Sequence, residues 1–93
     1  MRLLPFITAS LVFATLVGTI APPAQAQGAC QRLWVERNSI YKDAGYCFKT
    51  ERAIRYFGNA GCSYDDQRDV PLSSNDRRRI ADIVAEERDL GCR

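Results

Sequence analysis

The four cysteines of this chain place the strongest limit on its fold. Cys30, Cys47, Cys62 and Cys92 are separated by 17, 15 and 30 positions, whereas zinc sites usually take their ligands in close pairs such as C-x-x-C. An even number of cysteines in a short exported chain instead predicts two disulfides. Of the three pairings that four cysteines allow, we favour Cys30–Cys92 with Cys47–Cys62. The first bridge requires the first and last helices to pack antiparallel.

The first residues predict that the chain is exported. Arg2 precedes an uncharged, mostly apolar run over residues 3–20, and the small-residue motif Ala24-Gln25-Ala26 follows. This order is typical of a secretory signal peptide. The apolar run is also nearly long enough for an uncleaved membrane anchor. Because proline, glycine and hydroxyl residues dilute it, we expect cleavage after Ala26.

Cleavage would divide the chain into a signal peptide, residues 1–26, and a mature domain, residues 27–93. A lipid-modified Cys30 is a third option, but the residues before it lack the large apolar side chain expected there. We therefore expect a protein of the periplasm or of the medium outside the cell, with no membrane attachment after cleavage. So short a domain has a limited core, and each disulfide would add about 2–4 kcal/mol.

Apolar spacing predicts a mainly α, three-helix domain stapled by the two disulfides. Apolar residues recur three and four positions apart over Ala29–Ala44, about Glu51–Phe57, and from a capping-box-like start at Ser73 to about Leu90. A glycine follows each segment. Gly45, after the first, is placed to end that helix in a left-handed conformation.

Arg37 is the most informative single residue, because it interrupts the apolar stripe of the first helix. A guanidinium in such a place must be paired and hydrogen-bonded, or must lie at an opening in the packing. Glu87 interrupts the stripe of the third helix in the same way. We therefore predict an Arg37–Glu87 ion pair, with ligand binding by Arg37 as the alternative.

An aromatic group surrounds the end of the first helix. It consists of Trp34, Tyr41, Tyr46 and Phe48. We expect these side chains to pack in the core, and the alternative is a recognition surface for a glycan or peptide. Asn38 is expected to cap a helix or to bridge loops through its amide.

The composition argues against catalysis. The chain has no histidine, which removes the usual general base and most transition-metal sites, and the disulfides would remove the cysteines as nucleophiles. We therefore expect no enzyme activity, no cofactor and no metal. Loss of Arg2 with the leader leaves a net charge of +1, which gives no strong attraction to nucleic acid.

Two charged clusters are expected to be solvated. The acidic cluster Asp65, Asp66 and Asp69 offers too few oxygen ligands, at too loose a spacing, for a calcium loop. The basic run Arg77–Arg79 lies at the start of the third helix, where Asp82 is within pairing reach. An anionic partner is the alternative for this run.

Short motifs occur in order along the mature part: Arg37-Asn38-x-Ile40-Tyr41, Gly45-Tyr46-x-Phe48-Lys49, Tyr56-Phe57 and Val70-x-Leu72-Ser73. In these motifs the chain resembles the YARHG domain, a family of small extracellular bacterial domains, over roughly Leu33–Glu87. It looks like a four-cysteine branch with C-x-x-L-W-x-x-R-N, G-Y-C-F and G-C motifs. In the name-giving motif, Lys42, Asp43 and Ala44 replace alanine, arginine and histidine, so no role of that histidine transfers. The resemblance implies an exported domain, often attached to other modules, without an established activity.

These features favour a non-catalytic binding or interaction module of the cell envelope, whose partner would be an envelope protein or a glycan. One alternative is a small secreted inhibitor of an envelope enzyme, with residues 58–70 as an insertion loop. A less favoured alternative is a carboxylate-dependent hydrolase, which would need two acids that converge in a cleft. The sequence does not indicate an oligomeric state.

Overall fold

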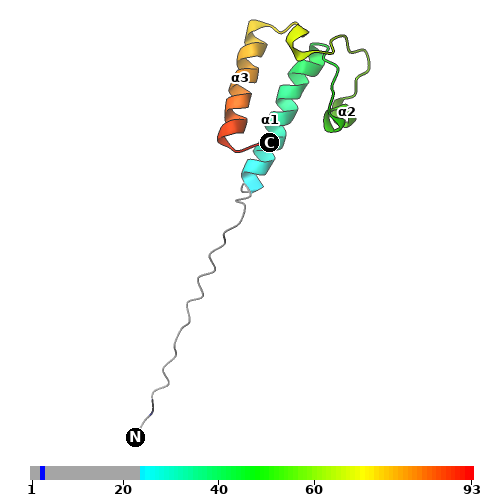
Figure 1. Ribbon diagram of the computed structural model, residues 1–93. Coiled ribbons are helices and arrows are strands. Elements are labelled where there is room, and N and C mark those ends of the chain that lie inside the picture. The colour runs from blue at the N-terminus through cyan, green and yellow to red at the C-terminus, as the bar shows by residue number, and fades with distance from the viewer. Residues whose placement is uncertain (1–2, 4–23) are drawn as a thin grey trace.

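The computed structural model describes residue 3 and residues 24–93. In this part the chain forms α1 (Ala24–Asp43), α2 (Glu51–Phe57), the short 3₁₀ helix η1 (Gln67–Asp69) and α3 (Ser74–Asp89). Figure 1 shows α3 beside α1 on one side and the short α2 on the other side. The predicted mainly α class is confirmed.

The predicted leader, residues 1–26, lies mostly outside the described residues. Its last three residues are described, and they form the first turn of α1, which therefore begins five residues before the predicted start at Ala29. Within the described ranges, no helix is both long and apolar enough to cross a membrane.

Both long helices end in the same hydrogen-bonded motif. At the end of α1 the Gly45 amide donates to the Lys42 carbonyl, and the Tyr46 amide donates to the Tyr41 carbonyl. Gly91 and Cys92 repeat this pattern at the end of α3. These are Schellman ends, which need a left-handed residue after the helix. Gly45 has φ +95° and Gly91 has φ +70°, so the predicted role of Gly45 is confirmed.

Both α-helices that follow a loop begin with a hydroxyl cap. The Thr50 side chain accepts a hydrogen bond from the Ala53 amide at the start of α2, and Ser73 accepts one from the Asp76 amide at the start of α3. Such caps satisfy amides that have no partner within the helix. The predicted helix starts at these two positions are therefore confirmed.

The predicted disulfide pairing is confirmed. Cys30 in the second turn of α1 bonds to Cys92 after α3, across a separation of 62 residues. Cys47 bonds to Cys62, across 15 residues. The first bridge fixes α1 and α3 antiparallel. The second joins the segment between α1 and α2, residues 44–50, which we call the link, to the loop after α2.

The contact between α1 and α3 buries one large aliphatic side chain from each helix. Leu33 is 1% exposed and Ile83 is 0% exposed. The rest of the predicted α3 stripe is less buried than its spacing indicates, because Val84 and Leu90 lie at the margin and are exposed. A second apolar cluster lies around α2 and the link, and its buried members are Tyr46, Phe48, Ala53 and Val70.

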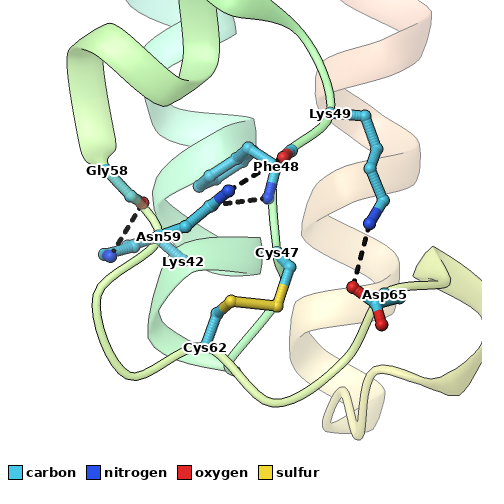
Figure 2. The surroundings of a disulfide bond; sticks show 8 residues. All are labelled: Lys42, Cys47, Phe48, Lys49, Gly58, Asn59, Cys62 and Asp65. Atoms are coloured by element: carbon cyan, nitrogen blue, oxygen red, sulfur yellow. Dashed lines mark hydrogen bonds and ion pairs between the residues drawn. A yellow bond between two sulfur atoms is a disulfide. The ribbon is translucent and has the colours of Figure 1, made fainter.

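The segment between α2 and η1 is fastened to the link that follows α1 (Figure 2). The Asn59 side chain accepts a hydrogen bond from the Phe48 amide at 2.7 Å and donates one to the Phe48 carbonyl at 3.0 Å. The Cys47 amide donates to the Tyr64 carbonyl, and the Tyr64 amide donates to the Gly45 carbonyl. These bonds satisfy buried backbone groups that have no regular sheet to pair with.

We predict that Gly45→Ala destabilises the domain more than Gly61→Ala. A side chain at a left-handed position costs about 1–2 kcal/mol, and the new Cβ at position 45 would lie 3.3 Å from the Tyr64 ring. Gly61 is also left-handed, with φ +71°, but a Cβ there meets open space. Urea unfolding of the oxidised proteins measures the difference. Equal destabilisation would show that the Tyr64 contact contributes nothing.

We predict that Asn59→Ala lowers the free energy of unfolding by about 1–3 kcal/mol, because it leaves two backbone groups of the buried Phe48 without partners. The exposed Asn75→Ala is the matched control, and we expect it to change stability by less than about 0.5 kcal/mol. Hydrogen exchange gives a local measurement. The Phe48 amide should lose protection in Asn59→Ala, and unchanged protection would contradict this role.

Candidate functional site

Arg37 and Glu87 form the predicted ion pair. Arg37 Nε lies 2.7 Å from Glu87 Oε1, and Arg37 Nη2 lies 3.2 Å from Glu87 Oε2. This paired geometry is the strong form of an arginine–carboxylate contact. The side chains are 23% and 12% exposed, so the pair lies at the edge of the α1–α3 interface and remains accessible from one side.

A second pair joins the same two helices, and the sequence did not indicate it. Arg79 on α3 lies 2.6 Å from Glu36 on α1. The hydrogen bond from Arg79 to Glu36 raises the pKa of Arg79 above its ordinary value. Asp82, which was expected within reach of Arg78 and Arg79, forms neither pair. Arg78 donates to Asn75 instead, because residues three positions apart are neighbours on a helix surface.

The predicted aromatic group forms a continuous row of rings only together with Phe57, which the prediction did not include. Tyr41 contacts Tyr46, Tyr46 contacts Phe48, and Phe48 stacks on Phe57 at 5.1 Å. Trp34 meets Phe57 at the end of this row. Tyr46 and Phe48 are buried, whereas Trp34 and Tyr41 are half-buried. The middle of the row therefore lies in the core, and both of its ends, Tyr41 and Trp34, reach the surface.

Trp34 is covered by groups from α2. The Arg52 guanidinium carbon lies 3.7 Å from the centre of the Trp34 ring, which is a cation–π contact. The Arg52 side chain also donates to Gln31 on α1. Tyr56 meets Trp34 edge-on at 5.6 Å and is 56% exposed. A cationic and an aromatic side chain thus lie on the surface directly above the only tryptophan.

Two cavities adjoin Trp34. The first, which we call the disulfide cavity, has a volume of about 270 Å³ and is lined by Gln31, Trp34, Arg52 and the Cys30–Cys92 bridge. The second, which we call the link cavity, has a volume of about 260 Å³. Its lining includes Trp34, Arg37, Asn38, Tyr46, Phe48 and Lys49. Trp34 lines both cavities, so the candidate site combines Arg37 and three members of the aromatic row, Trp34, Tyr46 and Phe48, with side chains of α2.

Asn38 does not cap a helix or bridge loops as expected. Its side-chain nitrogen donates to the Trp34 carbonyl one turn back in α1, at 2.9 Å, and the residue is buried. The amide that bridges segments is that of Asn59. Its position directly after the Gly58 that ends α2 was the available signal, because side-chain amides commonly satisfy backbone groups where a helix gives way to a loop.

Sequence reasoning also missed the surface residues Arg52, Tyr56 and Lys49. Tyr56 carried a signal, since Tyr56-Phe57 is one of the motifs of the resemblance. Arg52 carried none, because an arginine on a short helix is ordinarily solvated. Only the approach of α2 to α1 brings its guanidinium over Trp34.

The acidic loop is occupied by structural contacts. Asp66 caps η1 by accepting from the Arg68 amide, and its carboxylate pairs with the Arg68 side chain at 2.7 Å. The Arg68 guanidinium lowers the pKa of Asp66 below its ordinary value. Asp65 pairs with Lys49 at 3.0 Å (Figure 2). Among the described residues, no group of three acids, cysteines or histidines is arranged to hold a metal ion.

Comparison with protein families gives one match. The model of the YARHG domain matches residues 10–88, which is well over half of the chain. The chain belongs to the YARHG domain family. Searches of curated proteins and of solved structures returned no match. The YARHG match includes Trp34, Arg37, Arg52 and Glu87 and ends before Cys92, so the bridge to Cys30 ties a residue outside the matched region to one inside it.

Two residues that differ from the YARHG motif, Lys42 and Ala44, make structural contacts in this chain. Lys42 stands where the family motif has alanine, and its ammonium donates to the Gly58 carbonyl at 3.0 Å, at the end of α2 (Figure 2). Ala44 stands at the position of the histidine and packs against the apolar cluster around the link. In this YARHG domain the motif therefore supports the fold.

We predict that Glu87→Gln destabilises the domain by about 1–3 kcal/mol, because it removes a charge-assisted, half-buried contact and leaves Arg37 poorly paired. The neighbouring Glu86→Gln is the control, since Glu86 is exposed. In an Arg37→Met background the same substitution should cost much less. Urea unfolding of the wild type, Glu87→Gln, Arg37→Met and the double variant gives this double-mutant cycle. Equal costs in both backgrounds would show that the pair does not contribute.

Proposed function

We propose that this YARHG domain is a non-catalytic binding module of the bacterial cell envelope, and that it binds through the surface around Trp34. The observation that carries the proposal is that Trp34 is not sealed in the core. It is half-buried, adjoins two cavities and is covered by the exposed side chains of Arg52 and Tyr56. Tryptophan, tyrosine and arginine are the residues most enriched among those that dominate binding surfaces.

The two disulfides and the family support a location outside the cytoplasm. All four cysteines are paired, and such bridges persist in oxidising compartments such as the periplasm. We propose on this basis that the N-terminal segment acts as an export signal and that the mature domain works in the periplasm or outside the cell.

The absence of catalysis is part of the proposal. The chain has no histidine, and its cysteines are held in disulfides. Among the described residues, four cavities have volumes of about 260–350 Å³, and none of these four is lined by two carboxylate side chains. The hydrolase alternative therefore finds no support among them.

The inhibitor alternative depended on a protruding loop at residues 58–70. The bonds of Asn59 and Tyr64 and the Cys47–Cys62 bridge hold this loop against the link after α1. Val70 at its end is buried. A loop whose first half is fastened to the link and whose last residue is buried favours a structural role, so the surface around Trp34 is the better candidate.

We predict that the oxidised mature domain sediments with purified bacterial envelope material. Arg52→Ala and Tyr56→Ala should each reduce the bound fraction severalfold, because both remove exposed contact area above Trp34. Arg55→Ala is the matched control, since Arg55 is exposed on the same helix and pairs only with Glu51. Protease treatment of the material beforehand distinguishes an envelope protein from a glycan.

Circular dichroism and unfolding curves establish that each variant is folded before binding is compared. A wild-type domain that stays in the supernatant, or folded Arg52 and Tyr56 variants that bind as well as wild type, would refute a binding role for this surface.

A further inference from the structure

The charged side chains that line the two cavities beside Trp34 are all cationic, and Arg93 lines both cavities. The carboxylates that pair with Arg37 and Lys49 lie outside these linings. The side chains that line the disulfide and link cavities include Arg37, Lys49 and Arg52. No aspartate or glutamate side chain lines either cavity, although the chain has 11 acidic residues. Low-dielectric walls that carry one sign of charge concentrate ions of the opposite sign.

Arg37 retains binding capacity although it is paired. Glu87 accepts from Nε and Nη2, and a guanidinium has a further terminal nitrogen with two donors. That nitrogen, Nη1, is not used by Glu87. Because Arg37 also lines the link cavity, the ion pair fixes the guanidinium in place and leaves a donor group for a ligand.

Lys49 and Arg52 are held by contacts that a ligand can replace. The Lys49–Asp65 pair has side-chain exposures of 54% and 88%, and exposed pairs of this kind are weak. Arg52 is exposed and rests on the Trp34 face. Both cations can therefore turn toward an incoming anion without loss of a buried interaction.

The walls of the two cavities are largely aromatic. Trp34 borders both, and Tyr46 and Phe48 border the link cavity. Each cavity, at about 270 and 260 Å³, is slightly smaller than the roughly 300–1,000 Å³ typical of drug-sized ligand sites. Each is suited to a single ring or side chain of a larger ligand.

We infer that the surface around Trp34 binds an anionic group, a carboxylate or a phosphate, that is carried on a ring. The ring packs against the aromatic walls of the link cavity, where Arg37 and Lys49 bind the anion. Arg52 in the neighbouring disulfide cavity adds a positive charge across Trp34. This inference rests on the proposed binding function and specifies the ligand chemistry for the same site.

Three probes with the same ring test the inference: benzoate, phenylphosphonate and benzamide. Titration into the ¹⁵N-labelled oxidised domain, followed by the NMR signals of the Trp34 indole and the arginine side chains, measures each dissociation constant. At least one of the two anions should bind at about millimolar concentration, at least fivefold more tightly than the neutral amide, and more weakly as salt rises. Which anion binds better distinguishes a carboxylate source from a phosphate source. Equal affinity for benzamide and both anions would overturn the inference.

Charge-removing substitutions on the protein give the second arm. Lys49→Gln and Arg52→Gln should each weaken binding of the preferred anion about two- to fivefold, the effect expected of a half-exposed ion pair. Arg55→Gln removes the same charge from α2 outside both cavities and should leave binding unchanged. If all three variants lost affinity equally, the effect would come from net charge and the inference would fail.

These outcomes are separable from those of the envelope-binding experiment. Envelope binding that is insensitive to the anionic probes and to Lys49→Gln would overturn the anionic ligand and leave the binding module intact. Charge-selective binding of the probes by a domain that does not sediment with envelope material would support the anionic site and refute the envelope function.

Discussion

Arg37 and Glu87 meet across α1 and α3, and the remainder of the domain depends on the antiparallel contact that they help to define. Their paired hydrogen bonds, the Cys30–Cys92 bridge and the buried Leu33 and Ile83 all act between the same two helices. A disulfide limits the unfolded chain, whereas the ion pair is formed only in the folded state. The ion pair, the disulfide and the buried aliphatic side chains together determine which face of α1 packs against α3. The link and α2 pack against another face of α1.

The other half of the domain is built with little regular structure. The link after α1 obtains its hydrogen bonds from the Asn59 side chain and from the Tyr64 backbone. Because buried backbone groups must be paired, these contacts take the place of a sheet. They hold the link beside the seven-residue α2, and this arrangement places Lys49 and Arg52 near Trp34. The candidate site therefore depends on the irregular half as much as on the helices.

Prediction from sequence succeeded where a residue broke a pattern. Arg37 and Glu87 each interrupted an apolar stripe, and burying either alone would be costly, so pairing was the physical solution. Prediction failed for polar side chains whose partners lie on other segments of the chain. Arg52 follows no pattern, and Asn38 was assigned the bridging role that belongs to Asn59. Amides and arginines have many possible partners, and only tertiary proximity selects among them.

The sequence by itself determined the three helices, their glycine ends, the expectation of two disulfides and the YARHG relationship, because these follow from local spacing, left-handed glycines and an even number of cysteines in a short exported chain. Among the three pairings that the cysteines allow, the antiparallel packing of α1 and α3 selects Cys30–Cys92 with Cys47–Cys62. The tertiary structure alone decided that Trp34 reaches the surface between two cavities, that Arg52 covers it and that acidic side chains are absent from both linings. The physical reason is that exposure and charge environment are properties of packing. They arise where α1, α2 and the link converge, which no single segment encodes.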